Sequence, residues 1–150
     1  LDTLIGAAAV IDFSDKQPLY GIHRTDFEKH LGNNPPERIL MRFDWSELWG
    51  TQDFYKNHPF LSLDAAEWLL DKGVRLLAMD TPTPDNPSDS QPSGKDSPVH
   101  KILLGNGIIL VEYLCNVKEL KKKEIDLIVL PLKVLDGDGS PARCVAVEYT

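Results

Sequence analysis

The sequence predicts an α/β fold, in which helices flank a mixed sheet. Two observations carry this prediction: short apolar runs of strand length recur along the chain, and two of the segments between them have helix-capping residues and helical apolar spacing. One of these runs, Ile108–Val111, has no polar face, which is typical of a strand buried on both sides. The 150 residues, of which 42% are hydrophobic, have the size and apolar content of one domain with its own core.

The first half of the chain is expected to alternate strands with helices. Thr25 and Glu28 have the spacing of a capping box, so a short helix is expected to begin here and to stop at Gly32. Ser62 is the expected N-cap of a second helix, which ends at Gly73. Three apolar segments around these helices are expected to be strands: Ala7–Phe13, Arg38–Phe43 and Val74–Met79.

An irregular segment between residues 44 and 62 carries five aromatic side chains. A loop without regular structure needs side chains that pack onto the core, so anchoring is the favoured role. The alternative is that these rings wall a pocket for a flat substrate. The five are Trp45, Trp49, Phe54, Tyr55 and Phe60.

The second half begins with residues 81–99, a stretch rich in Pro, Ser and Asp that is expected to be a surface loop leading to a helical turn at His100. The Lys-rich segment 118–124 is expected to be a solvent-exposed turn. The remaining apolar segments are expected to be strands, with a hairpin connection at Asp136–Gly139: Ile125–Leu130, Leu132–Leu135 and Ala142–Val147.

Charge and composition argue against several classes of partner. The net charge of −7 and the pI of about 5.0 give an acidic surface, which repels the phosphate backbone of nucleic acids. No apolar stretch reaches the length of a membrane span, and no basic segment precedes the apolar residues 4–11 as in a signal peptide. A cytoplasmic location is therefore expected.

The cysteines and three of the histidines are expected to be structural. Cys115 and Cys144 lie beside apolar residues and are expected to be small buried side chains, although a disulfide between them is possible in principle. His23, His30 and His58 each stand alone near loop or helix ends and are expected on the surface.

His100 and Glu112 are the candidate metal ligands. A carboxylate at the end of an apolar strand either reaches water or is held by a partner, because removing it unpaired from water costs several kcal/mol. A neutral imidazole and a carboxylate together suit zinc. Their interval of twelve residues fits no short ligand spacing, so the alternative stays open that Glu112 ends its strand in solvent and His100 caps a helix.

A motif around these two residues resembles a known family. It consists of His100 at the start of a helix, the turn Leu103–Gly105 and the strand end Val111–Asn116, which reads Val-Glu-x-Leu-x-Asn. It resembles the corresponding segment of the cyclase-type metal-dependent hydrolases, which include bacterial-type kynurenine formamidase and isatin hydrolase. The resemblance covers most of the chain through three further segments, Arg38–Phe43, Leu63–Asp85 and Leu130–Ala146.

The resemblance implies the swivelling β/β/α fold and an enzyme that uses two divalent ions, zinc or manganese. It implies that His100 holds the second ion and that Glu112 contacts both. The implied reaction is hydrolysis of an amide such as N-formylkynurenine, an arylformamidase step of tryptophan catabolism, or of a related cyclic amide.

The sequence departs from the family at its main metal motif, His-Gly-Thr-His-x-Asp-x-Pro-x-His, which this chain does not contain. In the family the motif lies upstream of the position of Leu1. We therefore expect one cyclase-like domain over residues 1–150, truncated at its N-terminus, with the catalytic residues on the upstream segment. The alternative is a domain that keeps the fold, lacks the metal and acts as a binding or structural protein.

Two expectations follow for the chain as given. It is expected to bind metal weakly and to hydrolyse no measurable substrate, because two protein ligands leave most of a metal shell to water. It is also expected to form a homodimer or higher oligomer. The family commonly pairs subunits, and the strand Ala7–Phe13 begins so early that it is expected to leave an open sheet edge.

Overall fold

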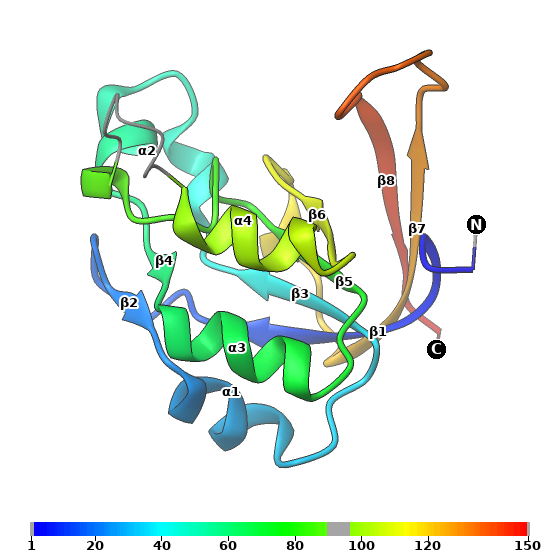
Figure 1. The fold of residues 1–150 in the computed structure, drawn as a ribbon, viewed down its shortest axis with the longest axis horizontal. Helices are drawn as coiled ribbons and strands as arrows, with labels where there is room; N and C mark the ends of the chain where they lie inside the picture. Colours follow the sequence, from blue (N-terminus) through cyan, green and yellow to red (C-terminus); the bar gives the residue numbers. More distant parts are fainter. Residues whose placement is uncertain (1, 90–96, 150) are drawn as a thin grey trace.

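A curled six-stranded sheet forms the centre of the computed structural model, which describes residues 2–89 and 97–149 (Figure 1). The strand order is β6-β5-β3-β1-β7-β8, in which β1, β3, β5 and β6 are parallel, β7 is antiparallel to β1 and β8 is antiparallel to β7. The strands are β1 (Ile5–Asp12), β3 (Arg38–Arg42), β5 (Leu76–Met79), β6 (Ile109–Val111), β7 (Glu124–Pro131) and β8 (Ala142–Val147). A small second sheet pairs β2 (Gly21–Ile22) with β4 (Phe60–Leu61).

Three helices of two to three turns cover one face of the sheet (Figure 1): α1 (Arg24–Leu31), α3 (Leu63–Asp71) and α4 (Pro98–Gly105). The shorter helix α2 (Gln52–Lys56) and three 3₁₀ turns lie in the connections: η1 (Trp45–Leu48), η2 (Pro87–Asp89) and η3 (Val117–Glu119). Within the described part of the chain, no helix has the length and apolarity needed to cross a membrane.

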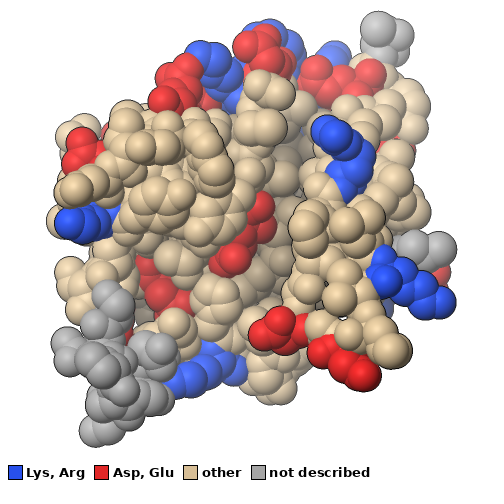
Figure 2. Space-filling view, turned by 90° about the horizontal axis from the view of Figure 1, so that it is seen from above, with Lys and Arg blue, Asp and Glu red and all other residues tan. Residues whose placement is uncertain are grey.

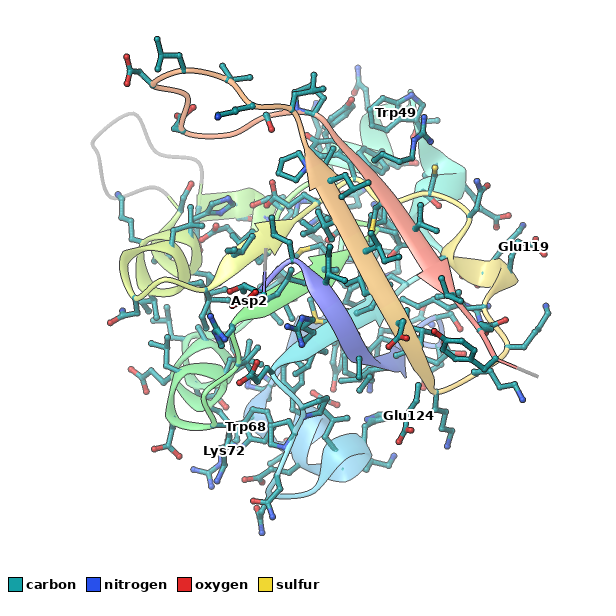
Figure 3. The ribbon with its side chains drawn as sticks, turned by 90° about the vertical axis from the view of Figure 1, so that its right-hand side faces the viewer. Asp2, Trp49, Trp68, Lys72, Glu119 and Glu124 are labelled. Carbon is teal, nitrogen blue, oxygen red and sulfur yellow. The ribbon has the colours of Figure 1, made fainter. Side chains whose placement is uncertain are left out.

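Each face of the sheet has its own hydrophobic core, because successive side chains of a strand point to opposite faces. On β3, Ile39 and Met41 pack towards the helices, whereas Leu40 packs on the opposite face. That opposite core is completed by β7 and by the segment after β6. Figure 3 shows β7 and β8 crossing in front of the other strands, so the end of the sheet folds back over its own face.

The predicted α/β fold with a mixed sheet is confirmed, but three of the expected strands differ from the structure. Leu132–Leu135 forms no strand, because β7 ends at Pro131 and β8 begins at Ala142, and two other strands occupy different places from those expected. The run Ile108–Val111 is expected to be buried on both sides, but β6 is an edge strand, and within the run only Ile108, which precedes the strand, and Val111 are buried. The expected open edge at Ala7–Phe13 is wrong, because β1 pairs with β7 along its first half and with β3 along its second half. The sheet edges are β6 and β8.

The helix ends agree in part with the sequence. α3 begins after Ser62 and stops before Gly73, whose φ of 72° is a conformation that glycine adopts without strain. The capping box predicted at Thr25 is wrong, because α1 begins after His23 instead. The carboxylate of Asp26 reaches back to the His23 backbone N–H at 2.9 Å, while Glu28 pairs with the Arg24 side chain.

Two predictions about isolated side chains are also corrected. His58 was expected on the surface, but it is 1% exposed and sits between α2 and β4, with its ring Nδ1 3.1 Å from the carbonyl oxygen of Pro59. Cys115 was expected to be buried but is exposed, and Cys144 is half-buried. Both cysteines are free thiols.

Candidate functional site

The candidate site lies where the parallel strands β5 and β6 end beside the start of α4. The register pairs Ala78 of β5 with Val111 of β6, so the chain leaves both strands at the same edge of the sheet. Side chains from the ends of parallel strands converge at such an edge, where α/β proteins commonly place their sites. Glu112 follows β6 directly, and the loop after β5 carries Asp85 to the first turn of α4.

The first turn of α4 holds His100 in a fixed direction. Asp85, which is 4% exposed, accepts a hydrogen bond from the Val99 backbone N–H at 2.7 Å and from the His100 backbone N–H at 3.3 Å. The same carboxylate lies 2.5 Å from the His100 ring nitrogen Nδ1. The other ring nitrogen, Nε2, is left to face β6.

His100 and Glu112 lie next to each other in space. The distance from His100 Nε2 to Glu112 Oε1 is 3.3 Å, which is an ion-pair distance. The two groups lack the alignment of a hydrogen bond, and Glu112 Oε1 is buried without any hydrogen-bond partner among the described residues. Glu112 therefore does not end its strand in open solvent, since its side chain is 23% exposed.

The electrostatics of the site come from two carboxylates that flank one imidazole. The hydrogen bond to Asp85, followed by the contact with Glu112, raises the pKa of His100 to about 9, although burial opposes the shift. Burial lowers the pKa of the neighbouring His58, which feels weaker attractions from the carboxylates of Asp85 and Glu112. At neutral pH the metal-free site therefore holds one imidazolium ion between carboxylates.

The residues present fit part of a divalent-metal site. A buried carboxylate oxygen without a hydrogen bond and an imidazole nitrogen face the same point, and this pair of donor types suits zinc or manganese. A structural or catalytic site needs at least three protein ligands. Across residues 2–89 and 97–149, no group of three or more His, Cys, Asp or Glu side chains is arranged to hold a metal ion.

A groove of about 1020 Å³ opens next to these side chains. On one side it is lined by His100, Glu112 and Tyr113, and on the other by the β7–β8 hairpin, with Arg143 and Cys144 among its residues. Figure 2 shows acidic side chains set in the hollow between the hairpin and the rest of the molecule. The groove is large enough for a small aromatic substrate.

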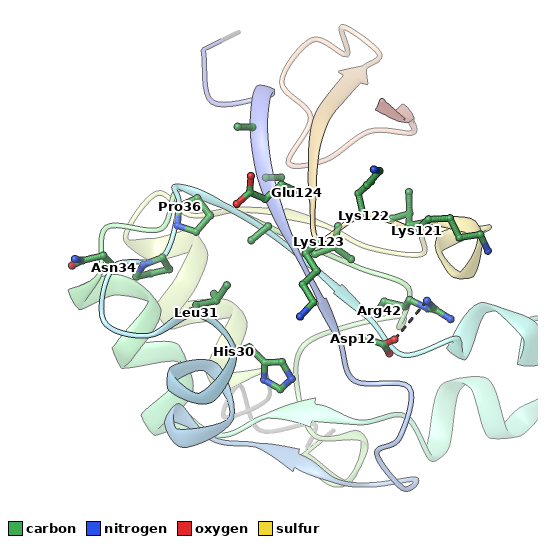
Figure 4. Close-up of a pocket in the computed structure, with 16 residues that line it drawn as sticks. Asp12, His30, Leu31, Asn34, Pro36, Arg42, Lys121, Lys122, Lys123 and Glu124 are labelled. Atoms are coloured by element: carbon green, nitrogen blue, oxygen red, sulfur yellow. Dashed lines mark ion pairs between the residues drawn. The ribbon is translucent and has the colours of Figure 1, made fainter. Parts of the chain in front are cut away.

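A second hollow, of about 860 Å³, lies elsewhere on the sheet, between β1, the end of α1 and the Lys-rich segment before β7 (Figure 4). Its polar groups include Lys123 and the ion pair between Arg42 and Asp12, whose charged atoms are 3.6 Å apart. We do not take it as the site, because neither His100 nor Glu112 lines it.

The sequence pointed to His100 and Glu112 but missed two residues beside them. Asp85 ends the segment Leu63–Asp85 and is not among the candidate residues from the sequence, although it contacts His100 directly. The second is His58, which is expected on the surface but is buried. No local pattern marks the contact of Asp85 with His100, because Ser97 and Pro98 are ordinary helix-start residues and the missing cap appears only in the structure. No local pattern marks His58 either.

Comparison with known proteins identifies a common set of relatives. Residues 1–86 match the model of the family described as putative cyclase. The chain is 33% identical over 142 residues to the kynurenine formamidase of Bacillus cereus, and 32% identical over 150 residues to that of Bordetella avium. These alignments include 94% and 99% of this chain. The chain spans 62% and 66% of the length of the two relatives.

Solved structures share the fold. An isatin hydrolase bound to the product analogue thioisatinate superposes with a TM-score of 0.82 at 26% identity, over 97% of this chain and 60% of that one. Isatin hydrolase A from Labrenzia aggregata, bound to benzyl benzoate, gives 0.83 at 26% identity, over 97% and 61%. A protein described as a predicted metal-dependent hydrolase from Bacillus stearothermophilus gives 0.78 at 25% identity, over 97% and 65%.

Proposed function

The chain belongs to the cyclase family, and from this we propose that it forms part of a metal-dependent amide hydrolase, an arylformamidase that acts on N-formylkynurenine. One observation carries the proposal: His100 Nε2 and the buried Glu112 Oε1 face each other at 3.3 Å, in a groove large enough for a small aromatic substrate. The alternative of a domain without metal is less well supported, because it leaves this buried carboxylate oxygen without a hydrogen-bond partner among the described residues.

In this proposal three residues of the site have a defined task. His100 supplies its Nε2 and Glu112 supplies its carboxylate to a divalent ion, zinc or manganese. When bound, such an ion would lower the pKa of a water molecule to about 7 and polarise the amide carbonyl. Asp85 holds the opposite nitrogen of the His100 ring. We assign no catalytic acid or base to this chain, and we propose that the family's histidine-rich motif supplies it together with the remaining ligands.

Metal binding tests the assignment of the two ligands. We expect weak binding of zinc or manganese to the wild-type chain in a calorimetric titration, because only two protein ligands are available. Glu112→Gln removes the carboxylate and should lower the affinity at least about tenfold, since even outer-shell changes cost 10–100-fold. The exposed Glu119 of η3 supplies the control, because Glu119→Gln should leave the affinity unchanged. Equal affinity of the wild type and Glu112→Gln would contradict the assignment.

Activity tests the reaction itself. The protein that contains this chain, loaded with zinc or manganese, is expected to release formate from N-formylkynurenine, and Glu112→Gln is expected to lower kcat/KM by at least about tenfold. Absence of hydrolysis in a protein that binds the metal would reject this substrate. Absence of both binding and hydrolysis would favour the non-catalytic alternative.

Two aromatic side chains support an aryl substrate: Tyr113, which lines the groove next to Glu112, and Trp49, which packs against Tyr113. Tyr113 and Trp49 are 45% and 62% exposed, and their rings meet edge to face with centroids 5.5 Å apart. Aromatic rings of this kind stabilise a flat ligand by stacking. We expect Trp49→Ala to raise KM for N-formylkynurenine about three- to tenfold with kcat little changed, because stacking of this kind contributes about 0.5–1.5 kcal/mol. A fall in kcat at constant KM would contradict a binding role for Trp49. The control is Tyr149→Ala, which removes an equally exposed aromatic ring from the C-terminal segment and should leave KM unchanged.

A further inference from the structure

Asp85 combines three contacts on one buried carboxylate. Its Oδ1 accepts from the Val99 backbone N–H at 2.7 Å, and its Oδ2 lies 3.3 Å from the His100 backbone N and 2.5 Å from the His100 ring Nδ1. Thr83 adds to the arrangement, because its hydroxyl oxygen is 3.5 Å from Asp85 Oδ2 and 3.4 Å from His100 Nδ1. The residue thus binds the backbone and the side chain of the same helical turn.

The helix that carries His100 has no capping side chain of its own. Ser97, at the N-cap position, has a left-handed φ of 53° and makes no capping hydrogen bond within the described residues. Pro98 at the first helical position has no N–H to donate. The N–H groups of Val99 and His100 are therefore the first donors that α4 exposes, and Asp85 accepts both from a loop fourteen to fifteen residues earlier. A negative charge at this end of a helix is also favoured by the helix dipole.

The contact with the ring decides which nitrogen of His100 is presented to the site. Because Asp85 Oδ2 accepts at Nδ1, a proton is retained on that nitrogen and Nε2 points the opposite way. Nε2 lies 3.3 Å from Glu112 Oε1, the buried oxygen that has no hydrogen-bond partner in the described parts of the chain. Rotation of the ring would break the 2.5 Å contact and bury a carboxylate with one fewer partner.

We propose that Asp85 is the positioning residue of this site, which fixes both the start of α4 and the ring of His100 so that Nε2 is the nitrogen offered beside Glu112. The part of this inference that concerns metal binding rests on the proposed function. A carboxylate that binds the distal nitrogen of a metal-binding histidine sets its orientation and tautomer. A carboxylate that only capped the helix would satisfy the two backbone N–H groups and leave the ring free to turn.

The inference is tested first on the metal-free wild-type chain. Long-range ¹H–¹⁵N NMR spectra of the labelled protein, recorded above the His100 pKa of about 9, report which ring nitrogen carries the proton. We expect the proton on Nδ1, with Nε2 unprotonated. A neutral ring that carries its proton on Nε2 would overturn the proposal, and this measurement needs neither a variant nor a metal.

The second test is the variant Asp85→Asn. Its amide oxygen can still accept from the Val99 N–H, but it can no longer serve all three donors with a charged group. We expect helical circular dichroism to be retained, the His100 ring to lose its fixed tautomer in the NMR spectra, and the affinity for zinc to fall about 10–100-fold. A variant with the wild-type ring spectrum and zinc affinity would show that Asp85 is only a helix cap.

Asp80→Asn is the matched control. Asp80 is as buried as Asp85 and follows the same strand, but its carboxylate accepts only backbone N–H groups, including those of Phe43 and Trp45. We expect this control to lose stability without a change in the His100 ring nitrogens. If the wild type binds no zinc, the proposed function fails while the NMR spectra still decide the role of Asp85. If zinc binds and the ring is unaffected by Asp85→Asn, only the positioning role fails.

Discussion

At the scale of single residues, two buried aspartates illustrate how the same side chain serves different purposes. Asp85 contacts a titratable ring, whereas Asp80 contacts only backbone groups: its Oδ1 accepts from Phe43 at 2.8 Å, and its Oδ2 accepts from Trp45 at 2.7 Å. Asp80 thereby joins the end of β5 to the segment after β3, on which the aromatic residues begin. Both aspartates lie in one short stretch of sequence, and only the path of the loop separates their roles.

We predict that the stabilising effect of Asp80 depends on pH. Burial raises the pKa of Asp80 to about 6, although the backbone hydrogen bonds oppose the shift. The folded state therefore holds this proton more tightly than the unfolded state does. Below about pH 4 the carboxyl contributes its full amount to the free energy of unfolding. As the pH rises to about 6, this contribution falls by up to about 3 kcal/mol. Urea unfolding of the wild type and Asp80→Asn should show a difference in stability that narrows across this window.

The exposed Asp71 provides the control for this prediction. Asp71→Asn, at a side chain that is 77% exposed, should give a stability difference from the wild type that stays nearly constant across the same pH window. If the difference in the free energy of unfolding between the wild type and Asp80→Asn widened as the pH rises, burial would not be the main influence on the pKa of Asp80.

The contacts within the site could be predicted only in part from the sequence. His100 and Glu112 are twelve residues apart, and only the resemblance to a family, not their spacing, suggested that they meet. The partnership of Asp85 with His100 joins residues fifteen positions apart, at a spacing that no periodic pattern encodes. His58 stands alone near a helix end, which is typical of a surface residue, but the fold buries it close to Asp85 and Glu112.

At the scale of elements, the aromatic segment between β3 and α3 has the anchoring role favoured from the sequence. Trp45 and Phe54 are buried, and the Trp45 ring N–H donates to the Phe54 carbonyl oxygen at 3.0 Å. Trp49 and Tyr55 remain exposed and pack edge to face against Phe54. The buried pair anchors the segment, which leaves the exposed pair available for contacts with a ligand.

We predict that Phe54 is the main anchor of this segment. Phe54 is fully buried and contacts the rings of Trp49, Tyr55 and Tyr113, so Phe54→Ala should lower the free energy of unfolding by about 3–5 kcal/mol. The neighbouring change Tyr55→Ala removes a half-exposed ring and should cost much less. If chemical denaturation gave equal losses in the free energy of unfolding for the two variants, the buried ring of Phe54 would not be the main anchor of the segment.

At the scale of the whole molecule, the fold class follows from local patterns, but the arrangement of the sheet does not. Apolar runs and helix caps predicted the elements, since each is decided by residues close in sequence. The central place of β1 depends on its pairing with β7, more than one hundred residues later. The same long-range pairing carries the β7–β8 hairpin across the sheet and so creates the groove beside Glu112.

The exposed edge of the molecule is therefore not the one inferred from the sequence. The tip of the β7–β8 hairpin carries large apolar side chains: Leu132, Val134 and Leu135 are 63%, 53% and 89% exposed. β8 is an edge strand whose outer backbone groups are unpaired in the sheet. Apolar surface next to an open strand edge favours association with another chain.

We propose on this basis that the chain forms a homodimer or higher oligomer through the β7–β8 hairpin. Light scattering at micromolar concentration should give at least twice the chain mass, and the stability of a dimer should fall by about 1.4 kcal/mol for each tenfold dilution, because association is linked to folding. The double change Leu132→Glu and Leu135→Glu places charge on the hairpin tip and should shift the protein towards monomer. Leu63→Glu, at a comparably exposed leucine on α3, should leave the mass unchanged. A wild-type monomer whose unfolding temperature does not depend on concentration would rule out this interface, as would a dimer that survives the hairpin substitutions.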